Sequence, residues 1–123
     1  MKFLQDRGIQ WRGHTIVYPA EQNIPTYLKQ KYIDNPNPQQ LSQEVLRHTR
    51  EVCYELRKWP NCLAVDVINE PRKQGRYLFA KSGFQLEKDI YKTAKPILVN
   101  KQLFINDWGI LDRGGVNMYG EVR

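Results

Sequence analysis

A short apolar run that ends in polar residues constrains the fold of this chain more than any other stretch. The run from Leu63 to Ile68 is rich in small and β-branched residues, and Asn69 and Glu70 follow it directly. Such a run is typical of a strand buried on both faces, as parallel strands under helices are. Core packing does not require an amide and a carboxylate at its end, whereas catalytic side chains lie at the C-terminal ends of parallel β/α strands. We therefore expect a parallel β/α fold with a functional edge at Asn69 and Glu70.

The flanking segments predict two more strands with helices between them. Between residues 39 and 59, apolar residues recur at intervals of three and four, which predicts an amphipathic helix. The order strand, helix, strand, helix, strand leaves crossovers long enough for parallel pairing. The predicted elements are a helix end at 1–7 stopped by Gly8, a strand at 9–18, helices at 26–32 and 39–59, a strand at 63–68, a helix at 84–94 closed by Lys95 and Pro96, and a strand at 103–105.

Length and composition predict one compact unit. The chain has 123 residues, of which 41% are hydrophobic, enough for a single core. No apolar run approaches the roughly 18 residues of a membrane span, and the first residues lack the apolar segment of a secretory signal. We predict no membrane partner and no signal peptide in this chain, and its compartment stays open.

The formal net charge of +6 first suggests an anionic partner such as nucleic acid. The Lys and Arg residues are scattered in short local groups, and no nucleic-acid-binding motif accompanies them. A solvated basic surface is therefore the favoured interpretation. A different β/α enzyme or a nucleic-acid binder is retained as an alternative, which steeply salt-dependent binding would favour.

The two cysteines, Cys53 and Cys62, form no metal-spaced cluster. Cys53 falls on the apolar face of the predicted long helix and Cys62 at the start of the central strand, so both are predicted to be small buried apolar residues. A disulfide between them is left open. Neither a metal site nor a cofactor is predicted.

Three groups of polar residues follow or interrupt the predicted strands: His14, the pair Asn69 and Glu70, and the pair Asn106 and Asp107. Taken singly, a histidine within a strand is usually hydrogen-bonded in the core or at its rim, and Asn and Asp after a strand usually build a turn. A carboxylate at a strand end also caps helices or pairs with arginine. Three parallel strands that bring polar residues to one edge together favour a functional site.

The runs 12–18, 66–70 and 103–108 resemble three successive signature strands of glycoside hydrolase family 10, the endo-1,4-β-xylanase family of (β/α)8 barrels. The similarity covers nearly the whole chain, and the histidine-bearing strand together with the Asn-Glu strand is a specific pair. The resemblance implies an α/β fold in which residues 1–123 form one segment of a TIM barrel with about three of its eight strands. It also implies retaining hydrolysis of β-1,4-xylan or a related plant polysaccharide without a cofactor, in a parent protein that is secreted.

The resemblance also implies roles for individual residues. Glu70 matches the general acid/base, which protonates the leaving glycosidic oxygen and later deprotonates the incoming water. Asn69 matches the amide that binds the sugar 2-hydroxyl beside the cleaved bond. His14 matches the histidine that lines the same subsite.

Five further residues have weaker assignments. Asp66, Asn106 and Asp107 are expected to support the site rather than perform chemistry. Tyr18 stands where the family usually has a tryptophan against the sugar, so stacking is weakened but retained. Gln22 is a candidate substrate contact in a loop that does not align cleanly with the family pattern.

The family's second catalytic carboxylate has no counterpart in these 123 residues. Retaining cleavage needs two carboxyl groups about 5–5.5 Å apart, and the nucleophile is a glutamate on a later strand of the barrel. We therefore expect weak or absent hydrolysis by this chain alone, with a non-catalytic carbohydrate-binding remnant as the alternative. The outer strands would have unpaired edges, which predicts association with the remainder of a barrel or self-association.

Overall fold

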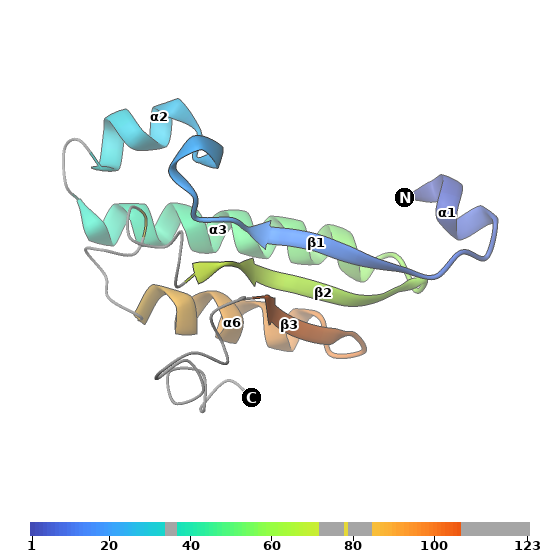
Figure 1. The fold of residues 1–123 in the computed structure, drawn as a ribbon. Coiled ribbons are helices and arrows are strands. Elements are labelled where there is room, and N and C mark those ends of the chain that lie inside the picture. Colours follow the sequence, from blue (N-terminus) through green and yellow to red (C-terminus); the bar gives the residue numbers. More distant parts are fainter. Residues whose placement is uncertain (34–36, 72–77, 79–84, 107–123) are drawn as a thin grey trace.

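The computed structural model describes residues 1–33, 37–71, 78 and 85–106, and its centre is a three-stranded sheet (Figure 1). The strands are β1 (Trp11–Val17), β2 (Cys62–Asn69) and β3 (Gln102–Asn106). They run parallel in the order β1-β2-β3. The predicted parallel pairing is confirmed, although β1 is shorter than the predicted range 9–18.

The central position of β2 follows from its sequence. It pairs with a neighbour on each side, and Val65, Val67 and Ile68 are all 0% exposed. β-Branched side chains suit this doubly covered position because they pack well on a pleated surface. The apolar run thus forms the buried centre of the sheet, and its polar end reaches the sheet's C-terminal edge.

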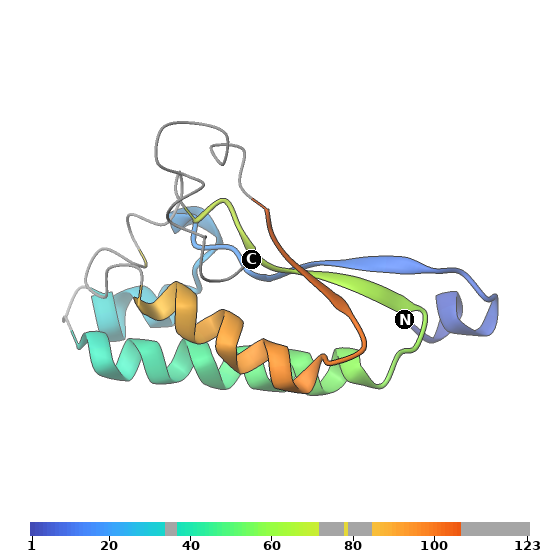
Figure 2. The same cartoon turned by 90° about the horizontal axis from the view of Figure 1, so that it is seen from below.

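Two long helices, α3 (Pro38–Arg57) and α6 (Gln85–Ile97), connect the strands. They lie side by side on one face of the sheet, as Figure 2 shows. The Asn37 side chain accepts a hydrogen bond from the Gln40 amide at 3.1 Å, and Pro38 occupies the first turn, where its missing N–H costs nothing. α6 continues through Pro96 to Ile97, so the prediction that Pro96 closes this helix is wrong by about one residue.

The core lies between these helices and the sheet. Its members are the buried apolar residues that α3, α6 and the strands turn toward one another, including Val45, Leu56, Val65, Val67, Ile90 and Ala94. Lys101, just before β3, donates hydrogen bonds of 2.7 Å to the carbonyl oxygens of Trp59 and Cys62. This cation ties the start of β3 to the connection between α3 and β2, because Trp59 follows α3 and Cys62 is the first residue of β2.

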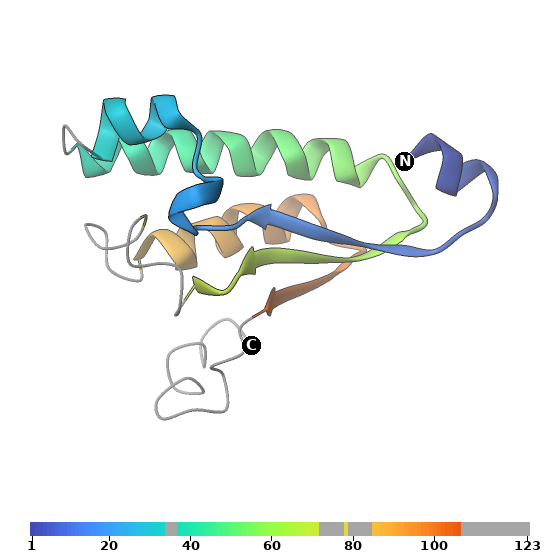
Figure 3. The ribbon, with the colours of Figure 1, turned by 45° about the horizontal axis from the view of Figure 1, so that its top comes forward.

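Short elements complete the described chain: α1 (Lys2–Asp6), η1 (Glu21–Asn23), α2 (Thr26–Leu28) and η2 (Lys29–Ile33). Gly8 has φ +66°, which agrees with its predicted role of ending the first helix. The helix predicted at 26–32 is a short α-helical turn followed by a π-helical segment. Figure 3 shows α2 and the segment after it beside the first turns of α3.

Both cysteines are buried free thiols, Cys53 at 0% and Cys62 at 1% exposure. Burial raises the pKa of the Cys53 thiol to about 11, so it stays protonated at neutral pH. The prediction of two small buried apolar residues is confirmed, and the disulfide that was left open is not formed. Among the described helices, none is both long and apolar enough to cross a membrane.

Candidate active site

Glu70 occupies the position immediately after β2 in an unusual backbone conformation. Its φ is +50°, in the left-handed region that residues with a side chain rarely adopt. Its amide donates a 2.6 Å hydrogen bond to the Asn106 carbonyl oxygen at the end of β3. Strained conformations of this kind concentrate at functional sites, where surrounding structure holds them in place. The carboxylate is therefore held at the sheet edge by a specific backbone geometry.

Tyr18 follows β1 and reaches across to the same carboxylate. Its hydroxyl donates a 3.1 Å hydrogen bond to Oε2 of Glu70. Partial burial raises the pKa of the Tyr18 hydroxyl, and the hydrogen bond to Glu70 and its negative charge raise it further. Tyr18 is therefore a neutral donor to Glu70 at physiological pH.

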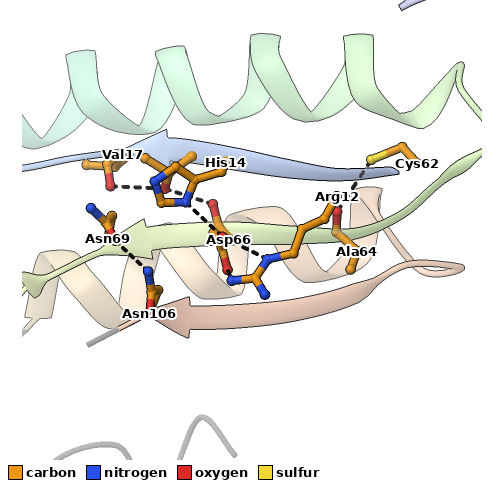
Figure 4. A network of polar contacts seen from close by, with 9 residues as sticks. Arg12, His14, Val17, Cys62, Ala64, Asp66, Asn69 and Asn106 are labelled. Atoms are coloured by element: carbon orange, nitrogen blue, oxygen red, sulfur yellow. Dashed lines mark hydrogen bonds and ion pairs between the residues drawn. The ribbon is translucent and has the colours of Figure 1, made fainter. Parts of the chain in front are cut away.

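The amide of Asn69 is oriented by the neighbouring strand. Asn106 Nδ2 donates to Asn69 Oδ1 at 2.8 Å, and Asn69 is 7% exposed (Figure 4). This contact uses the oxygen of the Asn69 amide, and among the described residues no hydrogen bond engages its NH2 group. The two strand ends thus aim a fixed hydrogen-bond donor beside Glu70.

A second polar cluster lies further back on β1 and β2 (Figure 4). Asp66 is 1% exposed, and its Oδ2 lies 2.8 Å from Nδ1 of His14. Arg12 approaches the same carboxylate with two nitrogens, Nε at 2.9 Å from Oδ2 and Nη2 at 2.5 Å from Oδ1. A buried carboxylate is stable when it is paired and hydrogen-bonded, and these two side chains meet that requirement.

Of the predicted site residues that the structure describes, one is not brought to this cluster. Gln22 is exposed in η1, and within the described ranges it makes no hydrogen bond to the other predicted residues. Asp107 lies outside the described residues. The predicted set Glu70, Asn69, Tyr18 and Asn106 is brought together at the sheet edge, with His14 and Asp66 behind it.

A hollow of about 360 Å³ lies beside this edge, between the end of β1, the α2 region and α3. Its lining includes Tyr18, Tyr27, Arg47 and His48, but not Glu70, Asn69 or His14. Among the described residues, Tyr18 is the one that the hollow shares with the carboxylate cluster. The described residues contain no group of three or more His, Cys, Asp or Glu side chains arranged to hold a metal ion.

The sheet and its polar strand ends belong to a chain that matches a known protein family. The model of glycosyl hydrolase family 10 matches residues 1–119. This chain belongs to glycosyl hydrolase family 10. Its three parallel strands and intervening helices are accordingly part of a TIM barrel, as the sequence predicted.

Among solved structures, this family 10 chain is similar to a mutant of Xylanase10C from Cellvibrio japonicus in complex with xylopentaose. The TM-score is 0.77 at 16% sequence identity, and the match covers 98% of this chain and 26% of that one. The chain therefore spans about a quarter of that protein's length. A search of curated proteins gave no match.

Sequence reasoning missed Arg12, to which it assigned no role in the site. Its position two residues before His14 places both side chains on the same face of β1, because strand residues alternate between faces. Asp66 pairs in register with His14 on the neighbouring strand. The alternation was readable in the sequence, but the register between the strands was not.

Proposed function

We propose that this chain carries the acid/base side of a retaining glycosidase site that acts on β-1,4-xylan or a related plant polysaccharide. The observation that supports it most directly is the left-handed conformation of Glu70 at the end of β2, with Tyr18 and Asn106 bound to it. Membership of family 10 supports the reaction class. The xylopentaose bound by the similar structure supports the substrate class.

In this proposal Glu70 is the general acid/base for the glycosidic oxygen. Asn69 donates hydrogens of its NH2 group to the sugar 2-hydroxyl, since its oxygen is already bound by Asn106. His14 lines the same subsite. Tyr18 offers an aromatic face and holds Glu70, and Gln22 is a more distant substrate contact.

The same proposal assigns supporting roles to Asp66, Asn106 and Asp107. The nucleophilic carboxylate is absent from this set, so we expect little or no xylan turnover by the 123-residue chain alone. Activity would require the remainder of a barrel. Nucleic acid is not expected as a partner, because the basic residues are scattered along the chain.

Calorimetry with xylo-oligosaccharides at millimolar concentration tests the substrate class. We expect measurable binding by the chain, retained in Glu70→Gln and weakened about fivefold in Asn69→Ala, which is the loss of one hydrogen bond. Asn100→Ala is the matched control, because this exposed asparagine precedes β3 at the opposite end of the strand. Absence of heat with the folded chain would refute sugar binding.

Reducing-sugar release from xylan tests the second half of the proposal. We expect the purified chain to give no more product than Glu70→Gln. Turnover that disappears in Glu70→Gln would show that the 123 residues suffice for catalysis. Binding without turnover under every condition, including when the rest of a barrel is supplied, would favour the carbohydrate-binding remnant instead.

A further inference from the structure

The hollow beside the sheet edge has no role in the reaction proposed above. Its volume of about 360 Å³ is within the range of pockets that hold small molecules. Three parts of the chain line it: the end of β1, the segment from η1 to α2, and the middle of α3. These parts bring apolar, aromatic and polar side chains together, which is the composition of a ligand site.

The inner lining of the hollow is apolar and packed. Ile16, Ile24 and Val45 are each at most 7% exposed and belong to the core. Nε2 of His48 lies 3.0 Å from the carbonyl oxygen of Ile16, which ties α3 to the end of β1. The inner lining is therefore held by contacts within the chain, as the walls of preformed ligand sites are.

Two exposed side chains of the lining are suited to bind a sugar. Tyr27 of α2 is 58% exposed, and Asn23 of η1 is also exposed. A tyrosine ring offers an apolar face to the C–H groups of a sugar ring, and its hydroxyl is a polar tip. An asparagine amide offers both donors and an acceptor to sugar hydroxyls. Together they match a ring that is apolar on its faces and polar at its edge.

The charged side chains of the lining favour a neutral ligand over an anion. Arg47 lies 2.8 Å from a carboxylate oxygen of Glu44 and 2.9 Å from one of Glu51. Among the described lining residues, the one arginine is thus bound by two carboxylates, and none is a lysine. Carboxylate oxygens accept hydrogen bonds from hydroxyl groups but repel an anion. The lining is therefore suited to a neutral molecule with several hydroxyls.

The hollow is connected to the candidate active site through Tyr18. This residue lines the hollow, and its hydroxyl donates the 3.1 Å hydrogen bond to Glu70. Asn23 directly follows Gln22, the predicted substrate contact that lies away from the carboxylate cluster. A ligand in the hollow therefore lies beside the residue that holds Glu70.

We propose that the hollow is a second carbohydrate site, which binds a short, neutral xylo-oligosaccharide through Tyr27 and Asn23, apart from the contact at Asn69. Its substrate class rests on the proposed function. Binding here places sugar against Tyr18 and so holds the polysaccharide near Glu70 without contacting the acid/base itself.

The experiment is a titration of the ¹⁵N-labelled full chain with xylobiose at millimolar concentration, followed by amide NMR. We expect shifts at Tyr27 and His48 that persist in Asn69→Ala, because Asn69 does not line the hollow. Tyr27→Ala should weaken this binding about fivefold through the loss of one aromatic contact, and Asn23→Ala by a similar factor through the loss of a hydrogen bond. Tyr54→Ala is the matched control, because Tyr54 is another exposed tyrosine and does not line the hollow.

Unchanged binding in both Tyr27→Ala and Asn23→Ala would overturn the proposal, with circular dichroism showing that each variant is folded. Stronger shifts at Tyr27 and His48 with inorganic phosphate than with xylobiose would overturn it as well, because they would indicate an anion site. So would shifts that follow the protein concentration and not xylobiose, which would indicate contact between two copies of the chain. Shifts confined to the sheet edge and lost in Asn69→Ala would refute the second site and leave the proposed function standing. No shift at either place would refute sugar binding as a whole.

Discussion

The two faces of the three-stranded sheet differ in what covers them and in how their side chains are satisfied. On one face, α3 and α6 cover a core of fully buried apolar residues such as Val65 and Ile90 (Figure 2). The opposite face carries Arg12, His14 and Phe104, which are largely exposed. Its polar side chains are paired with one another through the buried Asp66.

The difference shows that apolar burial and polar pairing occupy different sides of the same strands. Alternation of side chains lets one strand contribute Val65 to the core and Asp66 to the polar cluster with Arg12 and His14. In a closed barrel the second face points inward, where such polar groups require partners from other strands. The four predictions that follow test this division of roles, in order of expected effect.

The largest effect is expected from shortening a core side chain on the covered face. Ile90 on α6 is 0% exposed, and Ile90→Ala should lower the free energy of unfolding by about 2–5 kcal/mol. Phe104→Ala on the other face is the comparison. Since Phe104 is already 40% exposed, its loss should cost only about 1 kcal/mol. Urea denaturation followed by circular dichroism measures both, and equal costs would break the distinction between the faces.

Removing the carboxylate of Asp66 should have the next largest effect. Asp66→Ala deletes the acceptor of three hydrogen bonds and should lower the free energy of unfolding by about 2 kcal/mol. Asp6→Ala is the matched control because Asp6 also pairs with a cation, Lys2, but on the surface. Its cost should stay within about 0.5 kcal/mol. If Asp66→Ala and Asp6→Ala lowered the free energy of unfolding equally, the polar cluster around Asp66 would stabilise the chain no more than a surface ion pair does.

The face of the sheet that the helices cover was easier to predict from the sequence than the polar face. Apolar periodicity located α3 and α6 to within a few residues, and the β-branched run located β2, because burial on one or both sides leaves a direct pattern. The extent of α6 through Pro96 was missed, since proline usually ends a helix. The π-helical turn at Lys29–Ile33 has no sequence pattern of its own.

The candidate site was predicted as a set of residues but not as a network. Strand ends indicated Asn69, Glu70 and Asn106, which the structure brings together. Their mutual contacts depend on register, and the left-handed φ of Glu70 falls on a residue type that gives no signal for it. Arg12 was missed because its pairing with Asp66 is made between two strands.

A substitution at Glu70 isolates the backbone strain at the sheet edge. Glu70→Ala and Glu70→Gly both remove the carboxylate and its bond to Tyr18, but only glycine tolerates φ +50° without a steric penalty. We expect Glu70→Gly to be more stable than Glu70→Ala by about 1 kcal/mol in urea denaturation. Equal stabilities would mean that the left-handed conformation of Glu70 stores no strain. The conformation would then no longer support a functional role for Glu70.

The smallest effect is expected from Tyr18→Phe, and it should depend on pH. Because the pKa of Tyr18 is raised above its ordinary value of 10.0, the folded chain holds the phenolic proton more tightly than the unfolded chain does. The stabilisation from the bond to Glu70 is therefore fully present below about pH 10 and is lost as pH rises through the raised pKa. Denaturation at several pH values should show the unmodified chain more stable than Tyr18→Phe at neutral pH, with the difference shrinking above about pH 10. Tyr54→Phe, at an exposed tyrosine of α3, is the matched control. If the difference in stability between the unmodified chain and Tyr18→Phe stays constant with pH, the Tyr18 proton does not contribute to the bond between the end of β1 and Glu70.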